Sequence, residues 1–260
     1  MLKQVNHQLK VTQALVATII GGGRGVMGTA QPMQPAKALK LYEFEGCPFC
    51  RRVREVLTLL NLDVEIYPCP KGGQKYRQVV QNKGGKLEFP FFIDENTADQ
   101  MYESQAIIDH LFKHYGRTGK TPAKFKYAGF SIASTLSTVV GGARGVWLNK
   151  QVAQRAAPEK MLQLWSFEAS PYSRLVREVL SELELPYILH NVPKERWQDM
   201  GPAVMRFKPG TYIPLPNGKR EKVVEIMGRD IQVPYLVDPN TGVKMFESAQ
   251  IVDYLKKQYG

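Results

Sequence analysis

Most of this chain is a tandem duplication. The matching segments are residues 41–57 with 164–180, 89–94 with 233–238, and 101–111 with 245–255. In the first copy, apolar residues between 53 and 60 recur at helical spacing. Each copy predicts a strand, an amphipathic helix, a second strand, a basic loop or helix, and then a hairpin and a final helix. This order favours two copies of one α/β unit.

The duplication divides the 260-residue chain into four stretches. Residues 1–36 form an apolar, glycine-rich N-terminal segment, and residues 37–118 form the first unit. A basic linker with a second apolar, glycine-rich segment covers 119–160, and the second unit covers 161–260. A chain of this length buries ample core, and one or two domains are expected.

A short Gly-Arg-Gly motif or its variant precedes each unit. Residues 17–26 (ATIIGGGRGV) recur as 137–146 (STVVGGARGV), and each copy ends a mildly apolar segment. Neither apolar segment, 11–20 or 130–140, reaches the ~20 apolar residues that span a bilayer. We expect amphipathic helices that end at glycine and form a packing element before each unit. A shallow peripheral membrane contact is the alternative.

The four residues Cys47-Pro48-Phe49-Cys50 lie between the first predicted strand and the first predicted helix. Two cysteines at this spacing form a thiol-disulfide site or half of a metal site. A zinc site needs further ligands, and the rest of the chain offers Cys69 and four histidines that show no ligand spacing: His7, His110, His114 and His190. We therefore predict a redox site and no metal, with a pair of buried structural cysteines as the alternative.

The position of the motif predicts which thiol reacts. Cys47 is expected at the N-terminal end of the helix, where free N–H groups and the helix dipole favour an anion. Arg51, Arg52 and Arg54 follow and add positive potential, and both effects lower a thiol pKa. Cys47 is therefore the predicted nucleophile. Cys50, one turn further and more buried, is the predicted resolving thiol.

The charge balance is basic, and the cysteine count is low. The 35 Lys and Arg residues against 24 Asp and Glu give a net charge of +11, which favours acidic partners. The basic residues are scattered, so we do not expect nucleic-acid binding. Three cysteines do not make a disulfide framework, which favours a reducing compartment.

The two copies differ in length at one place. From Cys50 to Pro90 the chain advances 40 positions, whereas from Ser173 to Pro234 it advances 61. The additional residues lie within 191–231, which is rich in proline and glycine. We predict a surface insertion there that acts as a lid or a docking loop.

Three motifs together resemble a known family. The CPFC motif, Phe89-Pro90, and Glu103-Ser104 at the start of a helix look like a glutaredoxin-like thioredoxin fold of the type found as the N-terminal domain of glutathione S-transferases. The stretch 68–92 resembles the subgroup that includes the CPFC-bearing prostaglandin E synthase. It resembles more closely the tandem thioredoxin-fold proteins of plants, algae and cyanobacteria. The resemblance implies two tandem thioredoxin-like domains and a plastid location, or otherwise a cytoplasmic one.

The resemblance also implies a glutathione site in the first unit. In that family the proline is cis and faces the active site, which makes Pro90 the first cis candidate. The backbone of Phe89 would pair with the cysteinyl part of glutathione as an added strand. Glu103 and Ser104 would hold the γ-glutamyl end, and Lys86 is a candidate partner of the glycyl carboxylate. A plain helix cap is the alternative for the Glu-Ser pair.

The second unit lacks the thiols. Serines replace both cysteines, and a serine hydroxyl does not form a disulfide. We predict a catalytically silent copy that is kept for packing, partner binding or substrate placement. A serine or tyrosine hydroxyl that holds a glutathione thiolate is the alternative. The equivalent positions, with a second cis-proline candidate, are Ser170, Ser173, Val233, Pro234, Glu247 and Ser248.

These patterns predict a glutathione-linked thiol-disulfide oxidoreductase of glutaredoxin or transferase-like type. Glutathione is its expected co-substrate, and protein or small-molecule disulfides are its expected substrates. One alternative is a non-catalytic structural or regulatory subunit of a larger assembly, at a plastid membrane, contacted without a transmembrane span. Another is an iron–sulfur carrier in which Cys47 and glutathione hold a [2Fe–2S] cluster between two protomers.

Overall fold

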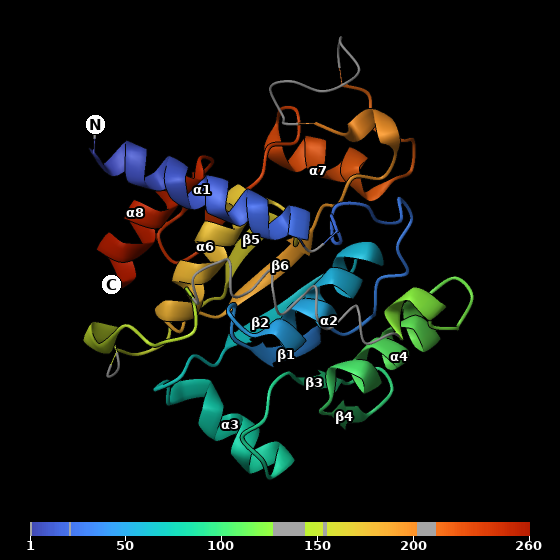
Figure 1. Cartoon of the computed structure of the whole chain (residues 1–260), viewed down its shortest axis with the longest axis horizontal. Coiled ribbons are helices and arrows are strands. Elements are labelled where there is room, and N and C mark those ends of the chain that lie inside the picture. The colour runs from blue at the N-terminus through green and yellow to red at the C-terminus, as the bar shows by residue number, and fades with distance from the viewer. Residues whose placement is uncertain (1, 21, 127–143, 153–154, 202–211) are drawn as a thin grey trace.

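A computed structural model describes residues 2–20, 22–126, 144–152, 155–201 and 212–260 (Figure 1). The fold is mixed α/β and of the thioredoxin type. After helix α1 (Leu2–Ile20), the first repeat forms β1 (Leu39–Glu43), α2 (Pro48–Leu59), β2 (Val64–Pro68), α3 (Lys75–Gly84), β3 (Phe91–Asp94), β4 (Asp99–Met101) and α4 (Ser104–Tyr115). The second repeat forms β5 (Leu162–Ser166), α6 (Pro171–Glu182), β6 (Tyr187–Asn191), α7 (Lys219–Met227), β7 (Tyr235–Asp238), β8 (Val243–Met245) and α8 (Ser248–Tyr259). Short 3₁₀ turns lie at Ala123–Phe125, Lys150–Val152 and Trp197–Asp199.

The predicted order of strands and helices is confirmed in both repeats. Helix α2 begins at Pro48, because Cys47 caps it. The predicted basic loop or helix of the first unit is a helix, α3, and α7 occupies the same place in the second unit.

The two repeats share one eight-stranded sheet, in the order β4-β3-β1-β2-β6-β5-β7-β8. Within each repeat the first two strands are parallel, and the third and fourth strands are antiparallel to their neighbours. The repeats join through antiparallel pairing of β2 with β6, in which Val64 lies opposite Leu189 and Ile66 lies opposite Tyr187. This junction protects the edge that each isolated repeat would expose along its second strand.

Alternating side chains of each strand serve the two faces of the sheet. Leu39 and Leu41 of β1 belong to the main core, beneath α2 and α4, while Tyr42 belongs to a smaller cluster with Val80 of α3. The second repeat has its own small cluster between β5 and α7, which includes Trp165 and Val223. The main core is continuous across the repeats and holds residues of α2, α4, α6 and α8.

Helix α1 of the N-terminal segment packs against the second repeat, whereas Thr29 and Gln34 of the same segment bond Leu59 and Asn61 of the first repeat. Helix α1 contacts α6, and His7 Nε2 lies 2.9 Å from the hydroxyl of Ser248 at the start of α8. The helix ends at Ile20, and Gly22 and Gly23 follow it with φ values of 69° and 65°, as expected for a helix that ends at glycine. Figure 1 shows α1 lying across α6, a helix that comes much later in the chain.

The second glycine-rich segment contacts the first repeat in return. Residues 130–140, where a second amphipathic helix was predicted, lie outside the described residues. The loop after them contacts the first repeat through Lys71, whose N–H donates to Val146 O at 2.7 Å and whose carbonyl accepts from Leu148 N at 2.9 Å. The same loop also bonds the second repeat, where Ser181 Oγ donates to Gly145 O at 2.7 Å, so it packs between the two repeats.

The insertion of the second repeat lies beside the N-terminal segment. Of the predicted range 191–231, residues 202–211 lie outside the described part. On either side of them, Lys194 N donates to Val26 O at 2.8 Å, and Lys219 N donates to Ala30 O at 2.9 Å. A role as a lid or docking loop stays a prediction. No helix among the described residues is long and apolar enough to cross a membrane.

Candidate functional site

Cys47 is the N-cap residue of α2. Its backbone is extended, with φ −86° and ψ 121°, and its sulfur accepts a hydrogen bond from Cys50 N at 3.2 Å. Pro48 occupies the first turn, where its missing N–H costs nothing. Cys47, Cys50 and Cys69 are all free thiols. The local geometry therefore directs helix N–H groups at the Cys47 sulfur, as the sequence predicted.

The two thiols of the motif have opposite pKa shifts. Burial acts to raise the pKa of Cys47, but hydrogen bonds from the thiol and backbone N–H of Cys50 outweigh it, and the Cys47 pKa lies below its ordinary value. Burial and the interaction with Cys47 raise the pKa of Cys50 well above its ordinary value. Cys47 is accordingly the thiol that ionises first, and Cys50 is held protonated as its donor.

The arginines after the motif act less directly than the sequence predicted. Arg54 is buried, bonds Glu43, and lies 2.9 Å from Glu168 Oε2. Arg51 Nε lies 3.0 Å from Glu55 Oε1. Most of their charge is therefore answered by carboxylates, and Arg54 is only a small contribution to the low pKa of Cys47. The expectation of a strong positive potential at Cys47 is corrected to helix-end hydrogen bonding.

A buried network of arginines and glutamates joins the two repeats behind the motif. Arg54 of α2 bonds Glu168 of the second repeat, and Arg177 of α6 bonds Glu45 of the first at 3.0 and 3.1 Å. Arg177 also lies 3.1 Å from Glu168. These side chains are at most 2% exposed, and each guanidinium makes several bonds, which compensates the loss of hydration.

Cys47 is covered in this structure. It is 3% exposed, whereas the neighbouring Phe49 is 52% exposed. A Cβ atom added to Gly46 would lie 2.2 Å from Val146 Cγ2, so the loop before the second repeat rests directly on the motif. Because of this contact, only a glycine fits at position 46 without displacing the loop.

The proline loop lies at the same end of the sheet as the motif. The Phe89–Pro90 peptide bond is cis, as predicted. Strand β1 pairs antiparallel with β3, so the end of β1 that leads to the motif meets the start of β3. The rings of Phe44 and Phe89 accordingly lie 6.0 Å apart, edge to face. Arg77 stacks over Phe89 at 4.9 Å.

An arginine of α2 connects the motif to the residues that are predicted to bind the γ-glutamyl end of glutathione. Glu103 precedes α4 with φ 66°, a left-handed conformation, and it is exposed. Ser104 is buried, and its hydroxyl accepts a hydrogen bond from Arg52 Nη1 at 3.1 Å. Arg52 is thus a candidate carboxylate ligand that sequence reasoning did not assign. Lys86 is exposed, and its carbonyl accepts from Tyr102 at 2.8 Å.

The second repeat reproduces this geometry without thiols. Ser170 caps α6 and accepts from Ser173 N at 3.2 Å, Val233–Pro234 is cis, and Glu247 has φ 66°. The hydroxyl of Ser248 is bonded by His7 of α1. The backbone conformations of the first repeat are retained, while α1 contacts the serine at the start of α8.

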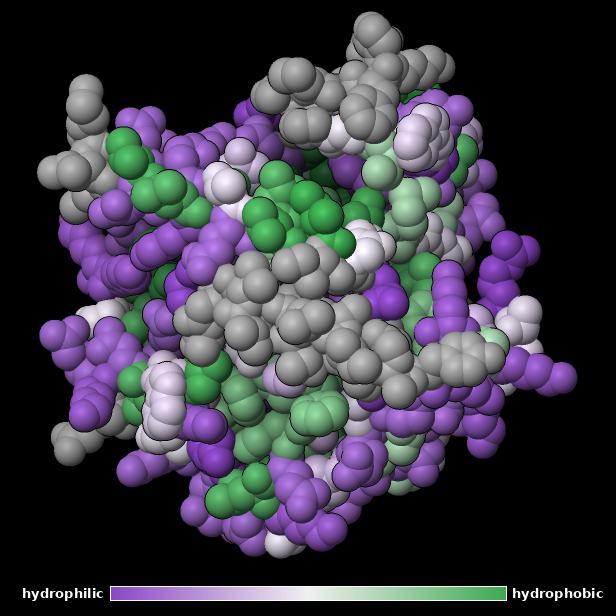
Figure 2. Space-filling model, in the orientation of Figure 1, coloured by the Kyte–Doolittle hydropathy of each residue, from purple (hydrophilic) through white to green (hydrophobic). Residues whose placement is uncertain are grey.

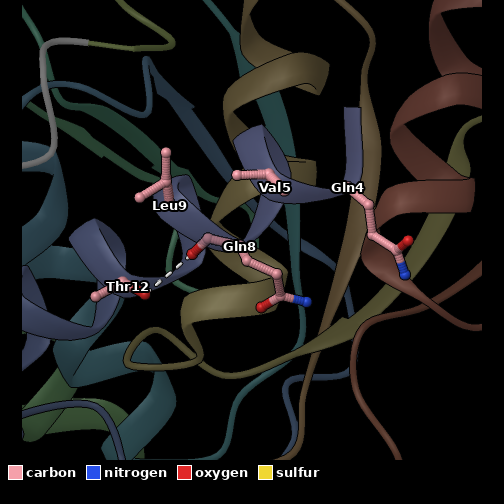
Figure 3. A pocket seen from close by; sticks show the side chains of 5 residues that line it. All are labelled: Gln4, Val5, Gln8, Leu9 and Thr12. Atoms are coloured by element: carbon pink, nitrogen blue, oxygen red, sulfur yellow. Dashed lines mark hydrogen bonds between the residues drawn. The ribbon is translucent and has the colours of Figure 1, made fainter. Parts of the chain in front are cut away.

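Two surface pockets lie elsewhere. One is lined along α1 by Gln4, Val5, Gln8, Leu9 and Thr12, whose side chains Figure 3 shows; Thr12 bonds Gln8 O at 3.0 Å. The other is lined mainly by residues 29–33, 59–60 and 112–122. Neither is lined by the motif or the proline loop. Figure 2 shows apolar surface gathered along α1, whose exposed apolar residues are Val5, Leu9, Leu15, Val16 and Ile19.

Sequence reasoning missed one cluster. His110 and His114 lie four residues apart on α4, and the structure places both beside Asp99 of β4. The statement that the histidines show no ligand spacing was therefore wrong for this pair. The i, i+4 interval is a signal that was present in the sequence.

Comparison with protein families gives one match. A model described as the glutathione S-transferase N-terminal domain matches residues 41–120 and again 164–260. The comparisons with curated proteins and with solved structures give no match. The two matched segments begin within the first strand of each repeat and include both proline loops and both Glu-Ser pairs.

Proposed function

This chain belongs to the glutathione S-transferase N-terminal domain family, and we propose that it is a glutathione-linked thiol-disulfide oxidoreductase with Cys47 as nucleophile. The observation that carries the proposal is the N-cap position of Cys47, where its sulfur accepts a hydrogen bond from Cys50 N at 3.2 Å. A thiolate at a helix N-terminus is both stabilised and nucleophilic.

The chemistry needs only thiols and disulfides. The Cys47 thiolate attacks one sulfur of a glutathione mixed disulfide or a protein disulfide, forms a new S–S bond, and expels the other sulfur as a thiolate. The thiol of Cys50 loses its proton and attacks the Cys47 sulfur, which releases the bound thiol and leaves a Cys47–Cys50 disulfide. Two glutathione molecules then reduce that disulfide and are themselves oxidised to one glutathione disulfide.

The same end of the sheet offers groups for glutathione. The peptide before cis-Pro90 is a free backbone edge for the cysteinyl part, and the N-terminus of α4 at Ser104 suits the γ-glutamyl carboxylate. Arg52, which already bonds Ser104, adds a guanidinium there. Glu103 is exposed and suits the ammonium group. Lys86 is kept as a candidate for the glycyl carboxylate.

We propose that the second repeat is catalytically silent. Ser170 and Ser173 carry no thiol, and α1 contacts Ser248. In this arrangement two thioredoxin-like domains form one tandem body. Each Gly-Arg-Gly segment contacts the repeat that it does not precede. The second domain then supports the first through the shared sheet and the buried arginine network.

A specific observation favours a second candidate function. Cys47 is 3% exposed, and Val146 lies against the neighbouring Gly46, which suits a structural or regulatory subunit whose thiol site is no longer used. In that case the exposed apolar residues of α1 would contact the partner or a plastid membrane surface. The two functions differ in whether the thiols are required.

The test is glutathione-dependent reduction of two substrates by single-cysteine variants. C47S should abolish reduction of both a glutathionylated peptide and a protein disulfide. C50S should retain the first reaction, for which glutathione replaces the resolving thiol, and should lose most of the second. C69S is the matched control and should leave both rates unchanged, because Cys69 is fully buried and burial raises its pKa well above the ordinary value. Wild-type protein with no reductase activity would favour the subunit function.

A further inference from the structure

We propose that Asp99, His110 and His114 form a binding site for a divalent transition-metal ion of the zinc type. One ligand atom from each side chain lies within 4.8 Å of the other two. His110 Nδ1 and Asp99 Oδ2 are 3.7 Å apart. A tetrahedral zinc ion with bonds of about 2.0–2.2 Å holds its ligand atoms roughly 3.3–3.6 Å apart, so small side-chain rotations complete the site.

Local folding orients the first histidine for this role. Asp94 Oδ2 lies 2.9 Å from His110 Nε2 and also accepts a hydrogen bond from Tyr115 at 2.6 Å. A carboxylate accepts and does not donate, so Nε2 carries the proton and Nδ1 presents its lone pair toward Asp99. A carboxylate behind a histidine is the usual outer-shell partner of a metal-bound imidazole.

The second histidine and the carboxylate complete three ligands on a surface. His114 lies one turn further along α4, and its ring centroid is 4.5 Å from that of His110. The side chain of Asp99 is 48% exposed, whereas that of His110 is 6% exposed. An ion reaches the cluster from solvent, and water is available for a fourth ligand. Two imidazoles and one carboxylate with an open position are typical of zinc and of other first-row divalent metals.

The second repeat separates a structural role from a metal role. At the equivalent positions it has Val243, Tyr254 and Gln258, none of which is a common zinc ligand in this combination. Tyr254 donates to Asp238 at 2.6 Å, the same bond that His110 makes to Asp94. Support of the buried aspartate therefore does not require histidine. Three potential ligands occur together only in the first repeat, at positions where the second repeat has none of them.

The experiment is a titration of metal-free, full-length protein with Zn²⁺ and with Co²⁺. The work is done in a C47S/C50S background, so that the thiols of the motif do not bind the metal. We expect one ion per chain, and a cobalt spectrum of nitrogen and oxygen ligands without thiolate charge-transfer absorption. The triple variant D99V/H110Y/H114Q copies the second repeat and should keep its thermal midpoint while it loses the ion.

Two results of this titration count against the site. Equal binding by the triple variant, or no binding by the parent protein, would overturn it. The single variant H114Q is the second test in case the triple variant does not fold, and it should weaken binding of both ions by tenfold or more. If the wild-type protein binds the ion and the C47S/C50S protein does not, the ion is bound at the thiols instead.

Discussion

At residue scale, burial and hydrogen bonding act in opposite directions on ionisable groups beside the motif. Hydrogen bonds outweigh burial at Cys47, whereas burial outweighs an ion pair at Glu55. Glu55 accepts from Arg51 at 3.0 Å, but its side chain is 1% exposed, and burial raises its pKa to about 7. The same kind of environment therefore favours the charged form of one group and the neutral form of the other, and the number of bonds to the charge decides which.

Glu55 should make stability depend on pH. Its folded-state pKa of about 7 exceeds the ordinary value of 4.5, so the folded protein holds a proton that the unfolded chain releases in this interval. The contribution is complete below pH 4.5 and is lost as the pH rises through 7. We expect E55Q to gain stability relative to the wild-type protein between pH 5 and pH 8, measured by urea unfolding. E95Q, on the surface, should show no such trend; a parallel trend in both variants would reject the assignment.

At element scale, the loop before each unit contacts the other unit. Gly25 of the first loop rests on Glu168 and Ala169, and its carbonyl accepts from Ala169 N at 3.2 Å. Gly145 of the second rests on Glu45 in the same way. Their φ values are 77° and 74°, which favour glycine at a position where a Cβ would also collide. Each of these two loops, which we call covers, therefore requires glycine for two reasons: the positive φ and the lack of space for a Cβ atom.

The cover should control access to Cys47. V146A removes the methyl groups that lie over Gly46, so we expect Cys47 to react several-fold faster with iodoacetamide, followed by mass spectrometry of the intact and digested protein. V26A is the matched control, because it makes the same change in the loop that faces the thiol-free repeat. If V146A and V26A react at the wild-type rate, some other element limits access to the sulfur.

At the scale of the whole molecule, the two units form one body. The junction combines a continuous sheet with a network in which Arg54 and Arg177 each bond a glutamate of the opposite repeat. Buried charges of this kind contribute little when all are paired, yet leave an unpaired charge when one is removed. A shift of one unit relative to the other would therefore leave buried charges of this network unpaired.

Removal of one arginine should destabilise both repeats together. We expect R177M to lose about 3–5 kcal/mol of unfolding free energy, because Glu45 and Glu168 then share Arg54 and leave uncompensated negative charge in the interior. K40M breaks a surface pair with Glu95 and should lose about 1 kcal/mol or less. Urea unfolding followed by fluorescence and by circular dichroism measures both. Loss of only one repeat in R177M would show that the units fold independently.

Sequence reasoning reached the elements and the local site because both are short-range. Apolar spacing and the x-Pro signals predicted the strands and helices, and the position of Cys47 before a helix predicted its cap. The role of the arginines was misjudged because their carboxylate partners were not assigned. Glu168, the partner of Arg54, lies in the other repeat, and Glu55, the partner of Arg51, lies one turn along α2. The histidine pair was overlooked because its third member, Asp99, lies on a separate strand.

The sequence by itself determined a repeated thioredoxin-type unit, a capped thiol in the first copy and no thiol in the second, because each depends on residues close together in the chain. Only the tertiary structure decided that β2 pairs with β6, that each glycine-rich loop contacts the unit it does not precede, and that Val146 lies against Gly46 next to the buried Cys47. These contacts join residues about 100 positions or more apart. Both repeats present similar strands, loops and charges, so local patterns do not distinguish packing within a unit from packing across the pair.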